Sequence, residues 1–327
     1  MITRIGFRRS LHCAAGVAML LSSPAWPQDF PSRPIRFVIP FAPGGPADVS
    51  ARTLSVMLTQ TLGQNLVIDN RAGGSGIVAA EIVVRARPDG HTILMCSTSV
   101  MVINPLVSPA IPYDALRDLV PVSLVSSSPY LLLASASFPA ATVRELVALA
   151  KAKPGTLNYG SAGIGSTSHL VAEIFRSMAG IEMTHVPYKG SSLAATDLIA
   201  GQIQLLFESV SSALPNVNSG RLRALGISSL KRFALMPQVP PISESGVPGY
   251  QAATWQGVCA PSGTPKPVIA KLNRAIGEAV HAPATVQRYA ALGAEAVGGT
   301  PEEFLAFIKA EIPRWASAIR ASGAQSR

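Results

Sequence analysis

The chain has 327 residues, of which 48% are hydrophobic and only 14% are charged, and its formal net charge is +9. So apolar a composition excludes a disordered, solvating chain, and the 27 glycines and 27 prolines follow no triplet period of the kind that builds collagen. The positive charge invites a nucleic-acid interpretation, but aromatic residues make up only 6% of the chain and no basic run is interleaved with them. We therefore expect about two domains and no nucleic-acid partner.

The first 25 residues have the three-part pattern of a secretory signal peptide. Three arginines precede an apolar stretch from Leu11 to Leu21, and small residues lead up to a cleavage position after Ala25. The stretch is too short to cross a bilayer, which takes about twenty apolar residues. We expect cleavage near Ala25 and a periplasmic mature protein that is not embedded in the membrane. Arg8-Arg9 leaves the twin-arginine route open beside the general secretory one.

The first part of the mature chain alternates strands with amphipathic helices. The expected strands are Ile35–Phe41, Leu66–Asp69 and Thr92–Cys96, and the expected helices are Ala47–Leu62 and Ile77 to about Ala86. This β-α-β-α-β order predicts a parallel sheet with right-handed crossovers.

A second alternating series begins near Val120. Its expected strands are Val122–Val125, Tyr130–Ala134, Leu157–Tyr159, Met183–Val186, Ile203–Phe207 and Leu222–Ser228, and its expected helices run from Thr142 to Lys153, from Ser166 to Ala179 and from Leu193 to Ala200. After a proline-rich stretch, a strand over Ala252–Ala260 and two terminal helices, beginning at Thr264-Pro265 and Thr300-Pro301, complete the chain. Two such α/β units would leave a ligand cleft between them.

Two cysteines, Cys96 and Cys259, remain after the signal peptide. An oxidising compartment permits a disulfide between them. Both lie in apolar, strand-like runs, where buried free cysteines are common. The sequence therefore favours two unpaired buried cysteines, with a disulfide as the alternative.

Glycine-rich turns follow several of the expected strands and lead into helices. Gly44 and Gly45 stand in the first turn, Gly74 in the second, and Gly163 and Gly165 in the third. Glycines free the backbone N–H groups, and a helix start adds partial positive charge, so each turn can cradle an anion. Taken alone, the first turn is better explained as a plain strand-to-helix turn, and the second has the same weakness. In the third, the hydroxyls at the helix start could cap the helix or hold a ligand carboxylate.

Motifs of several enzyme classes are missing from the sequence. The turn Gly163-x-Gly165-x-x-Ser168 lacks the third glycine of a dinucleotide fingerprint, and no suitably placed acidic residue follows about twenty residues later. There is no His-Glu-x-x-His, no Cys-x-x-Cys and no Gly-x-Ser-x-Gly. We therefore predict that the chain is not an enzyme and binds neither metal nor cofactor.

In their order and spacing, seven groups of segments resemble a periplasmic solute-binding protein of the tripartite tricarboxylate transporter type, the Bug family. The segments are Phe41–Gly45 with Asp48 and Ala51-Arg52; Asn70-Arg71 with Gly73-Gly74; Ser161–Ser166 with His169-Leu170; His185–Gly190; Ala224–Gly226 with Pro237–Pro240; Glu244–Gly249; and Trp255–Gly257 with Ala260–Pro265. Together they span essentially the whole mature chain.

The resemblance implies an α/β, two-lobed periplasmic binding protein of type II, a flytrap-like fold with a central cleft. The first lobe would comprise residues 26–126 and 251–327, and the second residues 127–250. Such a monomer would capture a small organic carboxylate, or a related amide or amino acid, and deliver it to the permease subunits of a tripartite tricarboxylate-type transporter. Backbone N–H groups and ordered waters, rather than an arginine clamp, would hold the ligand.

Residue by residue, the resemblance also implies which positions face the ligand. The expected ligand-binding residues are Gly44, Gly45, Asp48, Gly74, Ser75, Ser97 and Thr98 from the first lobe, and Gly163, Ser166, Thr167, His169, Tyr188 and Glu208 from the second. Glu208 stands where the family usually has Asp, and its extra methylene would move the carboxylate inward by about 1.5 Å. We expect Glu208 to change which ligand fits; the alternative is that it faces solvent or pairs with a nearby base.

Two other functions stay open at this point. An exported enzyme acting on a small carboxylate would need a base near a bound carbonyl, for which only His169 or Asp48 is placed. A binding protein could also serve as the ligand-sensing partner of a membrane sensor kinase instead of a transporter.

Overall fold

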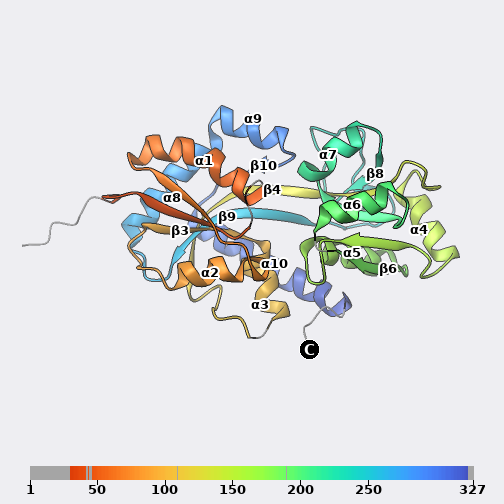
Figure 1. Cartoon of the computed structure of the whole chain (residues 1–327), viewed down its shortest axis with the longest axis horizontal. Helices are drawn as coiled ribbons and strands as arrows, with labels where there is room; N and C mark the ends of the chain where they lie inside the picture. The colour runs from red at the N-terminus through yellow and green to blue at the C-terminus, as the bar shows by residue number, and fades with distance from the viewer. Residues whose placement is uncertain (1–29, 42, 44–45, 109, 189, 323–327) are drawn as a thin grey trace, which may run out of the picture.

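The first three strands of the chain are parallel. The computed structural model describes residues 30–322 apart from 42, 44, 45, 109 and 189, so the expected signal peptide lies outside the described residues. β1 (Ile35–Ile39) lies between β2 (Leu66–Asn70) and β3 (Thr92–Ser97), and both neighbours run parallel to it. α1 (Pro46–Leu62) and α2 (Ile77–Val84) make the crossovers, as predicted (Figure 1).

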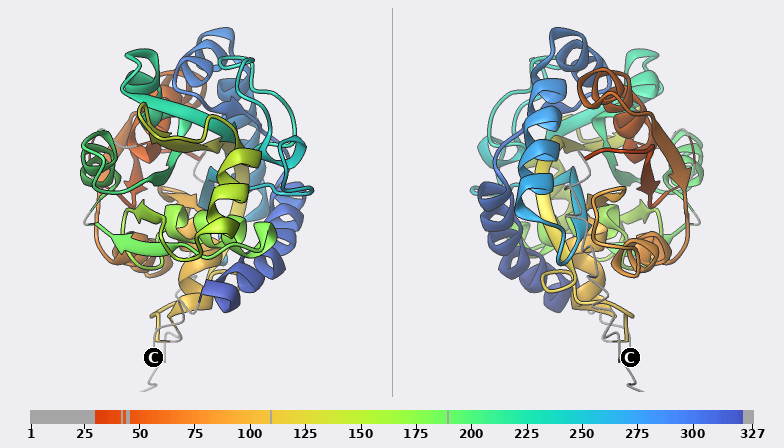
Figure 2. Two further views of the ribbon diagram at one scale, coloured as in Figure 1. Left: turned by 90° about the vertical axis from the view of Figure 1, so that its right-hand side faces the viewer. Right: turned by 90° about the vertical axis from the view of Figure 1, so that its left-hand side faces the viewer.

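From Phe37 to Ile39, β1 is apolar on both faces because helices cover both faces of its sheet. Val38 packs into a buried cluster with α2, whereas Phe37 and Ile39 pack with α1 and α8 (Lys266–His281). Alternate residues of a strand point to opposite faces, so a strand buried on both sides needs a continuous apolar run. Figure 2 shows α8 running alongside the sheet.

Two long antiparallel strands run from one half of the molecule into the other. β4 (Leu119–Ser135) pairs with β9 (Ala253–Pro261) in the first half and with β7 (Leu205–Ser209) and β8 (Leu222–Ile227) in the second (Figure 1). The sequence predicted two short strands here, and this prediction was wrong. Pro129 lies between the two expected strands, where β4 leaves β9 and begins to pair with β7, a position at which a strand tolerates proline.

The second half repeats the alternation of strands and helices. Its parallel strands are β5 (Asn158–Ser161), β6 (Thr184–Pro187) and β7 (Leu205–Ser209), and β8 (Leu222–Ile227) joins antiparallel to β4. Its helices are α4 (Val143–Ala152), α5 (Thr167–Ala179), α6 (Ser191–Ile199) and α7 (Val210–Asn218). The sequence did not predict α7, since Pro215 lies inside it. One mixed sheet results, in the order β2-β1-β3-β9-β4-β7-β5-β6, with β8 and β10 (Glu295–Ala296) also paired to β4.

Three helices, not the expected two, follow β9. α8 begins at Lys266 rather than behind a Thr264 cap, because the Thr264 hydroxyl donates to the carbonyl of Pro261 at 2.7 Å. The short α9 (Pro283–Ala291) was not predicted. α10 (Pro301–Ser322) does begin where expected, at Thr300-Pro301, and Thr300 and Glu303 form a capping box there. Short helical segments fill the remaining connections, at Gly74–Gly76, Ser99–Ile103, Asn104–Val107 (α3) and Ile242–Glu244.

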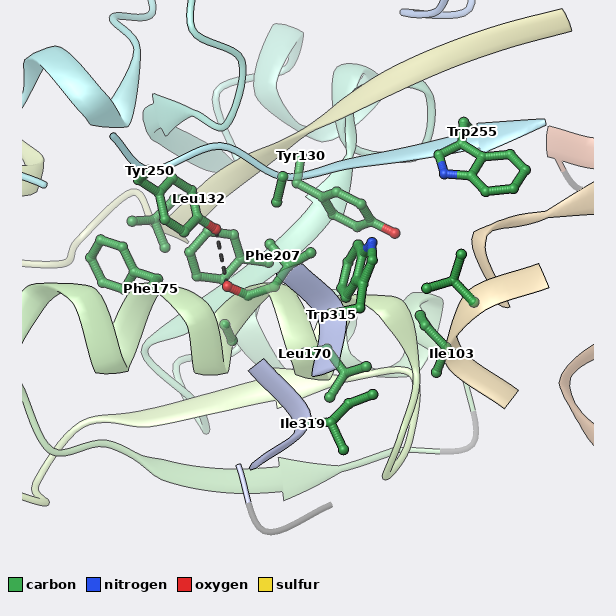
Figure 3. Close-up of a cluster of buried hydrophobic side chains, with 14 of the residues drawn as sticks. Ile103, Tyr130, Leu132, Leu170, Phe175, Phe207, Tyr250, Trp255, Trp315 and Ile319 are labelled. Carbon is green, nitrogen blue, oxygen red and sulfur yellow. Dashed lines mark hydrogen bonds between the residues drawn. The ribbon is translucent and has the colours of Figure 1, made fainter. Parts of the chain in front are cut away.

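The last helix joins the two halves. Trp315 and Ile319 of α10 lie in the same buried cluster as Leu170 of α5, and Figure 3 shows these side chains together. The Trp315 indole donates to Glu311 Oε2 at 2.9 Å, which satisfies its buried N–H. Burial of this apolar face therefore ties the end of the chain to the second half, a contact that periodicity alone could not show.

Cys96 and Cys259 form a disulfide, so the expectation of two unpaired cysteines was wrong. β3 and β9 are antiparallel neighbours in which Cys96 lies opposite Gly257. Cys259 is two residues beyond Gly257 and therefore on the same face of the sheet. The two Cα atoms are 5.9 Å apart, a usual separation for a disulfide. Strand register, which the sequence does not display, decides the pairing.

No helix in the described part of the chain is both long enough and apolar enough to cross a membrane.

Candidate functional site

A cavity of about 430 Å³ lies where the two halves meet, and both contribute to its walls. From the first half come Phe41, Ala47, Ser75, Ser97 and Ser99, and from the second Ala162, Ser166, Thr167, Ser168, Ser191, Glu208, Ser209 and Ser212. Tyr130 of β4 and Thr254 and Gln256 of β9 complete the described lining. The volume suits a small molecule, and the carboxyl ends of parallel strands are where α/β proteins bind ligands.

The walls of this cavity are rich in hydroxyl groups. Ten of its described lining residues are serine or threonine, and none is lysine, arginine or histidine. Any positive potential supplied by these described residues must therefore come from backbone N–H groups and hydroxyl dipoles.

Four helices begin at the cavity. Ala47 lies in the first turn of α1, Ser191 is the first residue of α6, and Ser166 and Ser209 immediately precede α5 and α7. The first N–H groups of a helix have no partner within the helix and carry partial positive charge. Several such ends around one cavity make it suitable for an anion.

The glycine turn after β5 is held in shape by its own side chains. Gly163 has a φ of 128° and Gly165 a φ of 74°, which favour glycine. Ser161 Oγ accepts from Gly163 N at 3.1 Å, and His169 Nδ1 accepts from Gly165 N at 3.2 Å. Ser166 then caps α5 by accepting from His169 N at 3.3 Å. Gly163 and His169 thus shape the turn, and neither lines the cavity.

His169 belongs to a stack of three rings behind that turn, of which His169 and Tyr159 are buried and His185 is half-buried. Its ring centroid lies 3.9 Å from that of His185, which in turn stacks on Tyr159 at 4.9 Å and lies 2.6 Å, through Nε2, from Ser161 Oγ. Burial, helped by the charge of Arg176, lowers the pKa of His169 to about 4. Burial and His169 itself lower the pKa of His185 to about 4. Both imidazoles are therefore neutral at pH 7 and support the turn from behind.

Glu208 is a buried carboxylate in the cavity wall. It is 7% exposed and follows the apolar run of β7, and its Oε1 accepts from Ser209 N at 3.0 Å and from Ser209 Oγ at 3.4 Å. Burial raises the pKa of Glu208, while hydrogen bonds from Ser191 and Ser209 oppose the rise. It forms no ion pair with a base among the described residues, so the structure does not favour the solvent-facing or paired alternative.

Five of the residues expected from the sequence therefore line one cavity: Ser75, Ser97, Ser166, Thr167 and Glu208. Gly74 adjoins Ser75 with a φ of 53° and shapes the turn before α2. Gly44 and Gly45 lie outside the described residues.

The other expected residues are held by contacts away from the cavity. Asp48, 2% exposed, accepts from Arg52 at 2.9 Å and from Asn70 at 3.0 Å, which ties the start of α1 to the end of β2. Thr98 is fully buried and its hydroxyl accepts from Trp255 N at 3.1 Å. The Tyr188 hydroxyl donates to Asp197 at 2.8 Å.

Sequence reasoning missed several lining residues, notably Ser191, Ser209, Thr254 and Gln256. Ser191 and Ser209 stand at helix starts after β6 and β7, so the rule used for the other turns could have found them. Gln256 is 7% exposed, and among the described groups its Oε1 has no hydrogen-bond partner. It lies on β9, whose place in the wall follows only from the sheet topology.

Two further cavities adjoin this one. A cavity of about 710 Å³ shares Phe41, Ser191, Glu208 and Ser212 with it. A cavity of about 320 Å³ shares Ser212, Thr254 and Gln256. The space between the halves therefore extends to either side of Ser212. Within the described residues, no group of three or more His, Cys, Asp or Glu side chains is arranged to hold a metal ion.

Known proteins resemble this chain along most of its length. The family described as the tripartite tricarboxylate transporter family receptor, TctC, matches residues 50–324. Protein BugT of Bordetella pertussis (strain Tohama I) is 38% identical over 306 residues, which cover 93% of this chain and 94% of BugT.

Solved structures show the same fold. The structure of R. palustris Rpa4515 with adipate has a TM-score of 0.82 and 36% identity, covering 90% of this chain and 99% of that one. The periplasmic binding protein BugD has a TM-score of 0.79 and 32% identity, covering 91% and 100%. These matches confirm the α/β periplasmic-binding-protein fold expected from the sequence.

Proposed function

Because the chain belongs to the tripartite tricarboxylate transporter receptor family, a family of solute-binding receptors, we propose that it captures a small organic acid in the 430 Å³ cavity between its halves. The observation that carries the proposal is the convergence of four helix starts on a cavity whose described walls hold hydroxyl groups and no basic side chain. Adipate in the similar Rpa4515 structure supports a carboxylate as the ligand class.

The ligand carboxylate would be held by N–H groups and hydroxyls at the starts of α5 and α6. Ser166 and Thr167 lie at one of these starts and Ser191 at the other. Bonds from such donors to a charged acceptor are stronger than neutral ones. Water molecules could bridge the remaining donors at little cost in affinity.

Binding would favour closure of the two halves. Ser75 and Ser97 come from the first half, whereas Ser166, Thr167 and Glu208 come from the second. A ligand that touches both sets binds the closed form better than the open one, and therefore shifts the population toward closure. β4 and β9, which run between the halves, are the natural hinge. We place the lobe boundaries at 26–126 with 251–327 and at 127–250.

The closed form would dock on the membrane permease subunits of a tripartite tricarboxylate-type transporter. This role requires export, removal of residues 1–25 and a monomeric protein in the periplasm. A catalytic role has less support, because the two candidate bases, Asp48 and His169, do not line the cavity.

The test is a thermal-shift screen. The exported protein is unfolded in urea, dialysed and refolded to remove carried-over ligand, and then heated with mono-, di- and tricarboxylates. A ligand at 100 times its dissociation constant stabilises the fold by about 2.7 kcal/mol, which for a protein of this size is a rise in Tm of about 4 °C. Absence of any shift would contradict the proposal. Recovery of a chemically altered ligand would favour an enzyme instead.

A further inference from the structure

Glu208 brings a carboxylate into a cavity proposed to hold an organic acid. Its side chain is 7% exposed and lines both the 430 Å³ cavity and the adjoining 710 Å³ cavity. A surface carboxylate would be hydrated and screened, but this one faces the ligand space from within the protein. A ligand in the 430 Å³ cavity must therefore be compatible with the Glu208 carboxylate.

The carboxylate is fixed in position. Oε1 accepts from the backbone N and the hydroxyl of Ser209, which immediately precedes α7, and Ser191 at the start of α6 lines the same cavity. These donors favour an acceptor at this position. The side chain is therefore held as an acceptor facing the cavity and is not free to swing away from a ligand.

A second bare carboxylate would fit badly beside Glu208. Two like charges a few ångströms apart in a partly dehydrated cavity repel strongly, and the described lining of the 430 Å³ cavity includes no lysine, arginine or histidine to separate them. Arg221 lines the adjoining 710 Å³ cavity, but it is exposed and its Nε donates to Ser219 Oγ at 3.1 Å. A group that carries hydrogen on nitrogen or oxygen would instead donate to Glu208.

Gln256 of β9 also indicates that the ligand carries a hydrogen-bond donor. Its Oε1 is buried and has no partner among the described groups, although the residue lines the same cavity. An unsatisfied buried acceptor is costly, and a donor brought by the ligand would relieve that cost. The cavity thus presents two acceptors, the carboxylate of Glu208 and the amide oxygen of Gln256, to a ligand that carries a donor.

Resting on the proposed function, we infer that the ligand is a monocarboxylate whose other end carries an amide, ammonium or hydroxyl donor that meets Glu208, and not a plain dicarboxylate. The starts of α5 and α6 bind the carboxylate of the ligand, and Glu208 accepts a hydrogen bond from the donor group at its other end.

The test uses pairs of acids that differ at one end only. Succinate is compared with succinamate, glutarate with glutaramate, and adipate with adipamate, by titration calorimetry at pH 7.5 on refolded ligand-free protein. In each pair the amide replaces one carboxylate at nearly constant shape, and three lengths allow for the unknown depth of the cavity. The variants are Glu208→Gln, the charge-preserving Glu208→Asp, and Glu278→Gln, which removes the same charge from an exposed position of α8.

Where the wild type binds either acid of a pair, we expect it to bind the amide at least tenfold more tightly than the dicarboxylate. Glu208→Gln should reduce that preference to less than threefold, while Glu208→Asp and Glu278→Gln should keep it. Equal or tighter binding of the dicarboxylates by the wild type would overturn the inference and leave the proposed function intact, as would an unchanged preference in Glu208→Gln. If none of the six acids binds, the proposed function itself is contradicted for this ligand class, and the inference falls with it.

Discussion

The disulfide between Cys96 and Cys259 should contribute much of the free energy of unfolding. It joins neighbouring strands of the first half, yet it encloses almost the whole second half, because the two cysteines are 163 residues apart in the chain. Reduction would leave the folded strands paired and would release the unfolded chain from this constraint. The perturbation therefore acts mainly on the unfolded state.

The size of the effect follows from the length of the loop. The chain-entropy relation gives about 5 kcal/mol at 25 °C for a separation of 163 residues, and measured values for disulfides are typically about 2–4 kcal/mol. We expect reduction to lower the free energy of unfolding by about 2–5 kcal/mol. Both cysteines are fully buried, so the disulfide must be reduced in the unfolded protein.

The assay is equilibrium urea unfolding of one sequence in two redox states. Oxidised protein is compared with protein that was unfolded, reduced and refolded in dithiothreitol. The double variant Cys96→Ala/Cys259→Ala serves as the control, since dithiothreitol should not change its unfolding midpoint. Coincident curves for the oxidised and reduced wild type, with disulfide formation verified by mass, would refute the reasoning from loop length.

Three further predictions follow from contacts described above. Gly257→Ala should cost about 1–3 kcal/mol of stability in urea unfolding, because its Cβ would lie 2.2 Å from Phe304 Cζ; Gly277→Ala, which meets nothing within 4 Å, is the control, and equal stability of the two variants would contradict this packing. The free energy of unfolding should fall as the pH is lowered from about 6.5 to about 4. In the folded state the pKa values of His169 and His185 are lowered to about 4, so over this range these histidines bind protons in the unfolded chain but not in the folded one. The double variant His169→Gln/His185→Gln should flatten this decline in the urea midpoint, and an equally steep decline would argue against these two histidines as its cause. Thr167→Val, which removes one cavity hydroxyl and leaves the Ser166 cap in place, should weaken binding of any carboxylate found in the thermal-shift screen about fivefold to tenfold, and unchanged affinity in calorimetry would place the ligand elsewhere.

Local patterns were sufficient to locate most of the fold. Apolar periodicity predicted β1 and α1, and glycine stops and capping residues predicted where several helices end and begin. The continuity of β4 could not be predicted in this way, because Pro129 and the neighbouring serines look like a turn until β7 and β8 are seen to pair with the same strand. α7 was missed for a similar reason, since Pro215 lowers helix propensity locally while tertiary packing still stabilises the helix.

Part of the candidate site was predictable from the sequence through the resemblance to the Bug family. The resemblance implied Ser75, Ser97, Ser166, Thr167 and Glu208, each of which lies within two residues of a strand end or a helix start, and topology brings these ends together. Asp48 and His169 stand at equivalent positions but are held by partners distant in sequence, Asn70 for the first and His185 for the second. Such pairings depend on strand register, which a single sequence does not reveal.

The central claim is that the cavity between the halves binds one small organic acid. The most direct measurement is titration calorimetry of refolded, ligand-free protein with the acid that raises Tm most, beside a variant with the cavity filled. Ala162→Trp places a large side chain at a lining position, and Ala152→Trp places the same side chain at the exposed end of α4. We predict one ligand bound per chain by the wild type and by Ala152→Trp, and no binding by Ala162→Trp although it unfolds cooperatively. Equal binding by all three proteins would contradict the account.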